Sequence, residues 1–523
     1  MWRMLADVIS QNAERFPDGP AFIEGDDVMT WCEYADRSDA FAAALVGRGF
    51  EPGDRIAVLL PDGPVVHAVY VGLEKAGLVI VGIGPRAGEA EIRHLLGLTG
   101  ACALVSHALH RDADLRELFV RLRADGLPLR EHLVIDAKCD FGGPLFEGGS
   151  SLEASLIADR RLEPDDLWLL NSTSGTTGMP KCVQHHQGRW HYFHELALKT
   201  GELCAKDVFM SVLPAPFGFG IWTAHITPAL LGAPTVLLSD FGADDMIECI
   251  ERHAVSVLAA VSTQFVMFLN SPILAQRDVS SLRALFTGGE RVPTERAAEF
   301  EERTGAFVLQ FYGSNETGAL SGTSTKDSRE IRLTTAGYVI EDMQVRLYDE
   351  AGHDVTSIGE GQAACRGPAN SHGYFEDVEA NAKLFTADGW MLTGDIATLD
   401  DDGVLRVVGR VADFIIRGGK NISGSEVERL VMTHPAVMLA AAVAMPDPVF
   451  GERVCVFVEL SEGSTLNLVD LTSHLADRGV GKEVFPERLE VVNELPRSPG
   501  GKIAKGRLRD DIRRRIADKT TKD

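Results

Sequence analysis

Short apolar runs alternate with helical patterns through the first four hundred residues of the chain. Amphipathic stretches such as 90–99 and 244–253 separate many of these runs. Because parallel strands need long crossover connections, usually helices, this alternation predicts mostly parallel sheets that are covered by helices. The predicted buried strands are 55–61, 78–83, 102–106, 132–136, 167–170, 208–214, 235–238, 255–261 and 282–286.

The sequence becomes β-rich with acidic turns near residue 338, and a smaller α+β pattern begins after Arg410. We therefore expect an α/β fold with a large N-terminal domain over 1–411, which includes the β-rich part, and a small, mobile C-terminal domain over 412–523. In the small domain, the expected elements are strands near 441–445 and 454–460, a helix near 467–478 and a basic helix from about Ile503.

The composition excludes several classes of protein. The 51 Lys and Arg residues against 76 Asp and Glu residues give a net charge of −25, whereas nucleic-acid binding needs a basic face. The eight cysteines are scattered without a C-x-x-C pair, which favours reduced thiols over a disulfide framework or a zinc site. The N-terminus lacks a signal-peptide pattern, and the longest apolar stretch, 257–269, is shorter than the roughly 18 residues of a membrane span. We expect a cytoplasmic protein without a membrane span.

The segment 172–181, Ser-Thr-Ser-Gly-Thr-Thr-Gly-Met-Pro-Lys, directly follows a predicted strand. Its hydroxyl groups and the backbone N–H groups freed by its two glycines could surround a phosphate chain, and Lys181 could neutralise that chain. The spacing does not fit the G-x-x-x-x-G-K-[ST] phosphate loop. A Ser/Thr/Gly linker is the alternative, but a linker would hardly begin at a buried strand and end in Pro-Lys.

This segment resembles the phosphate-loop signature of the acyl-adenylate-forming (ANL) superfamily, which includes acyl-CoA synthetases, firefly-type luciferases and the adenylation domains of peptide synthetases. Further matches follow in the order of the superfamily and span nearly the whole chain, and the ordered set is much more specific than any one match. They are Gly-Gly-Glu at 288–290, the Y-G-x-T-E-like segment 310–318, Thr-Gly-Asp at 393–395, the hinge and pivot region 409–422, and the lysine loop 496–503.

The resemblance implies a nucleotide site that transfers AMP from ATP to a carboxylic acid. Glu316, helped by Thr176, would bind Mg²⁺, and Tyr312 would stack on adenine. Asp395 would accept the ribose hydroxyls, with Arg410 as a second clamp. As alternatives, Glu316 could be a helix N-cap partner and Tyr312 a core residue. The implied ATP- and AMP-binding residues are Thr173, Ser174, Gly175, Thr176, Thr177, Gly178, Lys181, Gly288, Gly289, Glu290, Tyr312, Gly313, Asn315, Asp395 and Arg410.

Lys502 is the expected catalytic residue of adenylation, together with Glu316. It follows Gly500 and Gly501, which allow the loop to enter a crowded site. The alternative is that Lys502 is one of many basic residues of the tail. In the superfamily the small domain then rotates and presents a glycine pair, here Gly418 and Gly419, to the pantetheine arm of CoA.

Three positions depart from the superfamily pattern. Asn315 replaces the threonine before the magnesium-binding glutamate, although an amide can still donate to a phosphate oxygen. The hinge position is Ala412, with Asp413 next to it, so how the hinge is latched is left open. In the acyl segment 214–220, Phe217 replaces a histidine.

The acyl segment also indicates the substrate class. From 208 to 238 the chain contains no Asp, Glu, Lys or Arg, whereas an amino-acid substrate would need an acid to hold its ammonium group. We expect an apolar acid: aromatic, alicyclic, steroid-derived or medium-chain. The predicted pocket residues are Phe217, Phe219, Trp222, Phe265 and Ser314. The four histidines His185, His186, His191 and His194 are expected to be buried or solvated and not to bind metal.

The sequence therefore predicts an ATP-dependent carboxylate–CoA ligase with ATP, Mg²⁺ and CoA as cofactor and co-substrates. Only 21 residues follow Lys502, too few for a fused carrier domain of about 80 residues. Two alternatives are left open: an enzyme that loads a separate carrier protein, and a non-catalytic nucleotide-binding module. A homodimer is also left open.

Overall fold

The structure, a computed structural model, describes residues 3–136, 157, 160–173, 179–290, 292–418, 420–461, 463–497 and 503–520. The chain forms two compact units. The large unit consists mainly of Met1–Thr173, Met179–Gln344 and Arg366–Met391, and the small unit mainly of Val345–Cys365 and Leu392–Asp523.

A nine-stranded sheet forms one half of the large unit. Its central strands pair in parallel, as predicted, and only the pairs at its two ends are antiparallel. In spatial order the strands are β17 (Tyr338–Val339), β16 (Gly318–Gly322), β15 (Phe307–Ser314), β14 (Ala284–Gly288), β13 (Val257–Ala259), β11 (Phe209–Ser211), β12 (Thr235–Val236), β1 (Pro20–Glu24) and β2 (Asp27–Thr30).

A six-stranded sheet forms the other half, and only its edge pair β10–β9 is antiparallel. Its order is β10 (Cys182–His186), β9 (Leu167–Ser172), β4 (Val79–Gly82), β3 (Arg55–Leu59), β5 (Ala103–Ser106) and β8 (Glu131–Val134). Each of the predicted apolar runs overlaps one of the strands of these two sheets. The short hairpin β6 (Leu109–His110) and β7 (Ala113–Asp114) lies outside both sheets.

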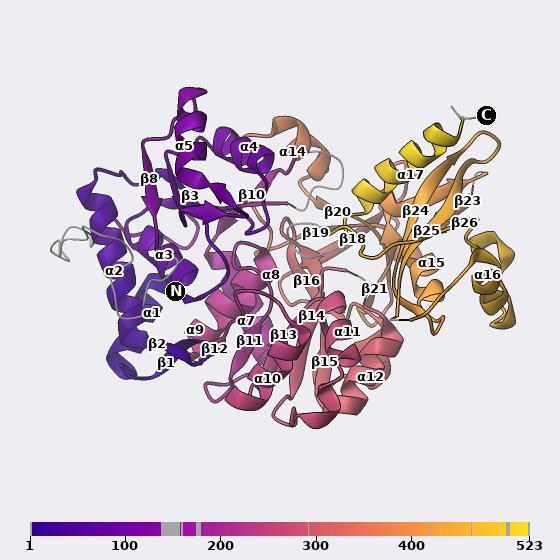
Figure 1. Ribbon diagram of the computed structural model, residues 1–523, viewed down its shortest axis with the longest axis horizontal. Helices are drawn as coiled ribbons and strands as arrows, with labels where there is room; N and C mark the ends of the chain where they lie inside the picture. The colour runs from indigo at the N-terminus through magenta and orange to yellow at the C-terminus, as the bar shows by residue number, and fades with distance from the viewer. Residues whose placement is uncertain are drawn as a thin grey trace. The chain divides into compact units, whose positions relative to one another are not determined.

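Helices cover the sheets of the large unit (Figure 1). Apolar side chains recur at helical spacing on α10, including Met246, Ile247 and Ile250, and pack with α11 and α12 against the nine-stranded sheet. The helices are α1 (Leu5–Arg15), α2 (Trp31–Gly47), α3 (Pro64–Lys75), α4 (Glu89–Thr99), α5 (Leu115–Ala124), α7 (Gly188–Gly201), α8 (Gly218–Gly220), the π-helix Ile221–Ile226, α9 (Thr227–Leu231), α10 (Ala243–His253), α11 (Ser262–Asn270), α12 (Thr294–Thr304), α13 (Arg329–Thr334) and α14 (Val378–Leu384).

The small unit contains two further sheets. The four-stranded sheet has the order β18 (Gln344–Tyr348), β19 (Glu360–Arg366), β20 (Met391–Leu399) and β21 (Leu405–Arg410). The five-stranded sheet is built from β22 (Phe414–Arg417), β23 (Lys420–Ser423), β24 (Val437–Asp447), β25 (Gly451–Leu460) and β26 (Arg488–Val491), with helices α15 (Gly424–Val431), α16 (Leu468–Asp477) and α17 (Lys505–Thr520).

The predicted fold class is confirmed: parallel sheets with flanking helices, a β-rich part and a small α+β C-terminal part. The boundary at residue 411 stays a prediction. Within the described ranges, no helix is both long and apolar enough to cross a membrane. None of the cysteines that the structure describes forms a disulfide.

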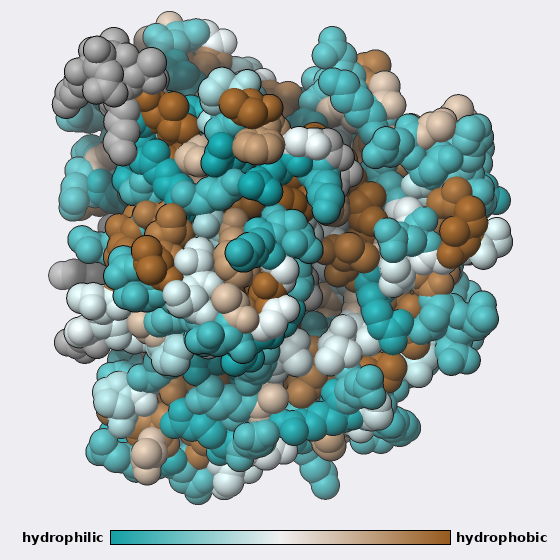
Figure 2. Space-filling view, turned by 90° about the vertical axis from the view of Figure 1, so that its right-hand side faces the viewer, coloured by the Kyte–Doolittle hydropathy of each residue, from teal (hydrophilic) through white to brown (hydrophobic). Residues whose placement is uncertain are grey.

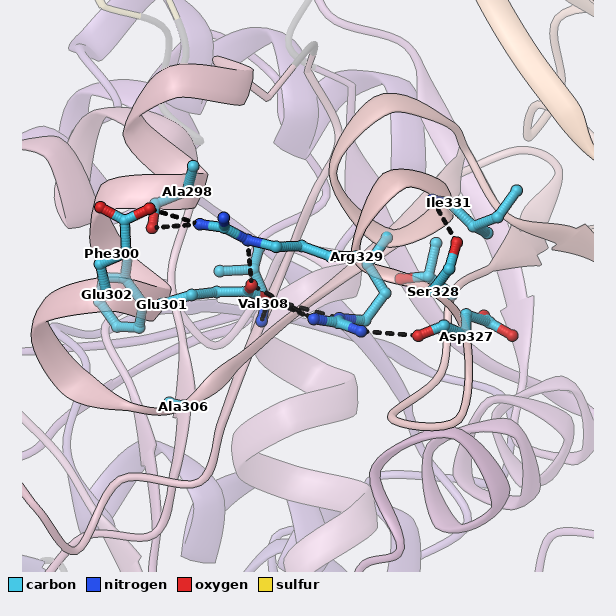
Figure 3. A network of polar contacts seen from close by, with 12 residues as sticks. Ala298, Phe300, Glu301, Glu302, Ala306, Val308, Asp327, Ser328, Arg329 and Ile331 are labelled. Carbon is cyan, nitrogen blue, oxygen red and sulfur yellow. Dashed lines mark hydrogen bonds and ion pairs between the residues drawn. The ribbon is translucent and has the colours of Figure 1, made fainter.

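A buried ion-pair network supports β15, the strand that carries Tyr312 (Figure 3). Glu301 on α12 accepts hydrogen bonds from Arg332 at 3.0 and 3.2 Å, from Arg329 at 3.2 Å and from the backbone N–H of Val308 at 3.1 Å. The carbonyl of Arg332 in turn accepts a 2.7 Å bond from the side chain of Gln310 on β15. The network therefore ties α12, α13 and β15 together.

We predict that Glu301→Gln lowers the free energy of unfolding of the large unit by about 3 kcal/mol, because the buried Arg332 loses its anionic partner. Urea denaturation followed by tryptophan fluorescence measures the change. Glu302→Gln, which removes only the exposed partner of Arg329, is the matched control and should have little effect. Equal losses in both variants would contradict the importance of the buried pair.

Candidate active site

Glu316 lies at the tip of a tight turn between β15 and β16. The backbone N–H of Ser314 donates to Thr317 Oγ1 at 2.9 Å, and the N–H of Thr317 donates to Ser314 Oγ at 3.1 Å. Ser314 also pairs with Gly318 across the two strands. This reciprocal bonding closes the hairpin, with Asn315 and Glu316 at its tip.

Tyr374 brings Glu316 and Lys181 together. Its Oη donates to Glu316 Oε1 at 2.8 Å, and Lys181 Nζ lies 4.6 Å from the centre of its ring. An isolated β-bridge between Tyr374 and Val183 holds the tyrosine beside β10. No sequence pattern around Tyr374 connects it with Glu316, 58 positions away, or with Lys181, so its role could not be predicted.

The two ends of the predicted phosphate loop face each other at the end of the β9–β10 pair. The N–H of Thr173 donates to the carbonyl of Lys181 at 2.8 Å, and the N–H of Lys181 donates to Thr173 Oγ1 at 3.3 Å. The hairpin ladder thus continues to the base of the loop. The loop residues Ser174, Gly175, Thr176, Thr177 and Gly178 lie outside the described residues.

The backbone passes through a crowded space where β14 ends. A Cβ atom on Gly288 would overlap the carbonyl oxygen of Phe311, and Gly289 has a φ of +80°. Gly313 is equally constrained, since a Cβ there would overlap the carbonyl oxygen of Gly318. Tyr312 is half-buried on the neighbouring strand β15, so it is not a fully buried core residue.

Glu290 has a structural contact that the sequence did not indicate. Its Oε1 accepts a 3.1 Å hydrogen bond from the N–H of Ser262, the first residue of α11. A carboxylate at this position satisfies one of the free N–H groups of the helix and interacts favourably with its dipole.

Three polar side chains hold the backbone of the acyl segment. Asp62 Oδ1 accepts from the N–H of Ala215 at 3.2 Å, and Asn171 Nδ2 donates to the carbonyl of Pro216 at 2.9 Å. Asn315 Oδ1 accepts from the N–H of Gly218 at 3.2 Å. The Asn315 side chain therefore connects the glutamate turn with the acyl segment.

Aromatic rings gather where this segment enters the π-helix. Trp222 is buried, stacks on the half-buried Phe219 with 5.6 Å between centroids, and meets Phe311 edge-on at 4.8 Å. Phe217 is also half-buried. Phe265 differs from these residues, because it is fully buried in the core of the nine-stranded sheet and contacts Phe300 on α12.

In the small unit, Asp395 and Arg410 are direct cross-strand neighbours on β20 and β21. Arg410 Nε lies 3.0 Å from Asp395 Oδ1. The carboxylate is mostly buried, with 11% of the side chain exposed, whereas 52% of the Arg410 side chain is exposed. Two predicted ribose-binding groups are thus placed together.

The residues around the hinge position contact helix α17. Arg509 Nη2 donates to the carbonyl of Ala412 at 3.0 Å and also pairs with the carboxylate of Asp413. Lys505 Nζ lies 3.4 Å from Asp413 and 2.9 Å from Glu428. Burial opposes ionisation of Asp413, but Lys505 and Arg509 outweigh it and lower the pKa of this carboxyl.

Gly418 forms the turn between β22 and β23 with a φ of +57°, and its N–H donates to the carbonyl of Phe450 at 2.8 Å. The guanidinium groups of Arg417 and Arg453 lie over the ring of Phe450, 5.0 and 4.9 Å from its centre. Ile416 and Val449 are exposed close by in the sequence.

The face in Figure 2 is mainly hydrophilic with separate hydrophobic patches. Gly419 and Lys502 lie outside the described part of the chain.

The sequence profile of the AMP-binding enzyme family matches residues 9–375, and that of the AMP-binding enzyme C-terminal domain matches residues 426–502. The chain belongs to the AMP-binding enzyme family. It is an acid-adenylating ligase of the ANL type, so the resemblance seen in the sequence is confirmed.

Characterised family members cover nearly the whole chain. A medium-chain fatty-acid–CoA ligase of Escherichia coli is 31% identical and covers 98% of this chain and 91% of its own length. A salicyl-AMP ligase/salicyl-S-ArCP synthetase of Mycobacterium tuberculosis is 32% identical, and the match covers 96% of this chain and 90% of the relative. The crystal structure of the anthranilate CoA ligase AuaEII with anthranoyl-AMP has the same fold, with a TM-score of 0.85 and 24% identity. The match covers 98% of this chain and 97% of that structure's chain.

The Glu316 carboxylate fits a magnesium ion. Family membership implies ATP as substrate, and Mg²⁺ that accompanies ATP takes most of its ligands from phosphates and water and only one or two from protein carboxylates. Tyr374 holds Oε1 of Glu316, so Oε2 can serve as the metal ligand. No group of three or more His, Cys, Asp or Glu side chains able to hold a metal occurs among the described residues.

The four histidines near the start of α7 are buried. Burial lowers the pKa of His186, His191 and His194 to about 4, and that of His185 also lies well below its usual value. They are therefore neutral at physiological pH and add no cation to the site.

Asp62, which holds the acyl segment, is an unusual carboxyl group. Burial and then the nearby charge of Glu24 raise its pKa to about 8, although the N–H of Ala215 acts in the opposite direction. His67, 4.0 Å away, is no counter-ion, because burial lowers its pKa to about 3. Folding therefore favours the protonated form of Asp62.

A raised folded-state pKa contributes stability at low pH that is lost as the pH rises towards the folded pKa. We predict that Asp62→Asn, which cannot ionise, becomes more stable relative to the wild type between pH 5 and pH 8, by roughly 2–4 kcal/mol. Urea denaturation at a series of pH values measures this difference. The exposed-site control Asp18→Asn should give no such trend, and a flat difference for Asp62→Asn would disprove the assignment.

Proposed function

We propose that this protein is an ATP-dependent, AMP-forming carboxylate–CoA ligase that uses Mg²⁺ and converts an apolar carboxylic acid to its CoA thioester. One observation carries the proposal: Tyr374 joins the lysine that ends the phosphate loop and the glutamate of the β15–β16 turn. A triphosphate placed there meets a cation, a metal ligand and the base of a donor-rich loop. The lack of a disulfide among the described cysteines and the use of ATP support a cytoplasmic location.

In the first step, a carboxylate oxygen of the acid attacks the α-phosphorus of ATP, an O–P bond forms, and pyrophosphate leaves. Bound Mg²⁺ would neutralise phosphate charge at Glu316. Lys181 would hold the outgoing phosphates, Tyr312 with the Gly288–Gly289 backbone would hold adenine, and Asp395 would hold the ribose. Lys502 would bridge the carboxylate and the α-phosphate.

In the second step, the thiol sulfur attacks the acyl carbon and AMP leaves. We propose that the chain hinges near Ala412, at the boundary between 1–411 and 412–523, and that Gly418 and Gly419 then face the pantetheine arm. The Asp413–Arg509 contact supports this, because it gives the turn a fixed attachment within the small unit.

The proposed substrate is an aromatic, alicyclic, steroid-derived or medium-chain acid. The stacked rings of Phe219 and Trp222 support an apolar pocket, and the uncharged stretch 208–238 provides no acid for an ammonium group. Phe265 is the weakest of the proposed pocket residues, because its contacts lie in the core.

The second candidate is an enzyme that transfers the acyl group to a separate carrier protein. The salicyl-S-ArCP synthetase of similar identity favours this candidate as much as the fatty-acid–CoA ligase favours the first. The identity of the thiol therefore needs a direct assay.

The experiment has two stages. Hydroxylamine trapping over a panel of aromatic, alicyclic, steroid-side-chain and straight-chain acids, with amino acids as the negative set, identifies the acid. We expect one apolar class to give hydroxamate and pyrophosphate. Thioester formation is then measured with free CoA and with isolated holo-carrier proteins, and CoA should be the better acceptor. No adenylation of any acid would support a non-catalytic nucleotide-binding module instead.

Lys502→Ala separates the two half-reactions. Adenylation should fall by about 10²–10³-fold, because the cation that stabilises the transition state is lost, whereas thioester formation from supplied acyl-adenylate should change little. Arg507→Ala, at an exposed basic residue of α17, controls for the loss of one positive charge. An equal loss of both half-reactions would refute the role of Lys502.

A further inference from the structure

Arg189 on α7 is a fully buried cation below the glutamate turn. Its guanidinium group donates to four acceptors that come from three separate segments of the large unit. They are His185 Nδ1 at 2.8 Å and the carbonyl oxygens of Ala369 at 2.8 Å, Asn315 at 2.9 Å and Glu316 at 3.4 Å.

One side of this arrangement leads to the phosphate loop. A guanidinium group can only donate, so His185 Nδ1 accepts and His185 Nε2 carries the proton. Nε2 lies 2.7 Å from Asn171 Oδ1 and donates to it. Asn171 belongs to β9, two residues before Thr173, and its amide nitrogen also binds the acyl segment.

The other side leads to the metal-binding turn. Nη1 and Nη2 of Arg189 reach the carbonyls of the two residues at the tip of the turn, Asn315 and Glu316. The Glu316 carbonyl also accepts a 2.8 Å bond from the N–H of Ser371. The backbone position of Glu316 is therefore set by Arg189 and by the 369–371 segment.

The chemistry of the side chain matters here. Removing a cation from water carries a large desolvation penalty, and apolar residues of similar volume often serve as well when only packing is required. The planar guanidinium group has fixed donor directions, so it can bind two adjacent carbonyls and a ring nitrogen at once. A lysine ammonium cannot bind all three with the same geometry. The contacts of Arg189 thus favour a role in setting geometry.

We propose that Arg189 is a positioning residue for adenylation: it fixes the glutamate turn relative to the base of the phosphate loop, so that Mg²⁺ and the triphosphate are bound in one arrangement. This inference rests on the proposed function for the role of Glu316. Arg189 itself contacts neither substrate nor metal and acts through the chain Asn171–His185–Arg189 and the backbone of the turn.

Arg189→Lys tests the inference, because it retains the positive charge and loses the planar guanidinium group. Using the best acid of the panel, pyrophosphate release is measured over a Mg²⁺ titration. We expect the Mg²⁺ concentration for half-maximal rate to rise about tenfold and kcat for adenylation to fall about tenfold, as for other changes to groups that orient metal ligands. Thioester formation from supplied acyl-adenylate should stay within about twofold of the wild type.

Arg283→Lys is the matched control. Arg283 also forks a carboxylate, Asp207, and the carbonyl of Gly201, but it lies at the opposite end of β14 from Gly288. This control should lose stability without a shift in the Mg²⁺ response. If Arg189→Lys fails to fold, His185→Asn is the second variant. Its side-chain oxygen can take the place of Nδ1 as an acceptor for Arg189, but its shorter side chain no longer reaches Asn171, so it should shift the Mg²⁺ response in the same direction by about threefold.

A second readout does not depend on turnover. Mg²⁺ and ATP added together should raise the melting temperature of the wild type, and that increase should be much smaller for Arg189→Lys. If no acid is adenylated, the proposed function fails while this measurement still tests Arg189. A folded Arg189→Lys variant with wild-type Mg²⁺ dependence and wild-type thermal shift would overturn the inference.

Discussion

Parallel pairing of the central strands is the constraint on which the rest of the large unit depends. In a parallel sheet all carboxyl ends lie at one edge, and ligands bind outside that edge. The acyl segment follows β11, the Gly288–Gly289 turn ends β14, and the glutamate turn ends β15. The pairing register of the sheet therefore brings together segments that lie about a hundred residues apart in the sequence. The buried apolar faces of the strands hold this register, because a one-residue slip would expose them.

Polar groups then fix the geometry that register only approximates. Asp62, Asn171 and Asn315 each bind one backbone group of the acyl segment, and Tyr374 joins the lysine and the glutamate. These groups lie in partly dry surroundings, where a hydrogen bond is stronger and a missing partner costs more. The partly dry surroundings therefore make the site rigid and sensitive to single substitutions.

Nine strands of the two large sheets and the helices α4, α10, α16 and α17 could be predicted from the sequence, because apolar periodicity is a local property. The cluster around Tyr374 could not, since a lone tyrosine has many roles and its partners are distant in sequence. Asn315 is predicted to contact phosphate, and the structure adds a second role, since its side-chain Oδ1 accepts a hydrogen bond from the N–H of Gly218. Phe265 illustrates another limit: an apolar ring at helical spacing suits a pocket and a core equally well, and only the packing shows that it contacts Phe300.

The attachment of the Val411–Asp413 turn to α17 has a mechanical consequence within the small unit. Helix α17 begins two residues after Ile503, and Ile503 forms a β-bridge with Arg497. The paired residues Arg497 and Ile503 therefore belong to the same part of the small unit as the helix that contacts the turn. A change of backbone angle at the turn would therefore move α17 and the Arg497–Ile503 bridge together, as one rigid piece.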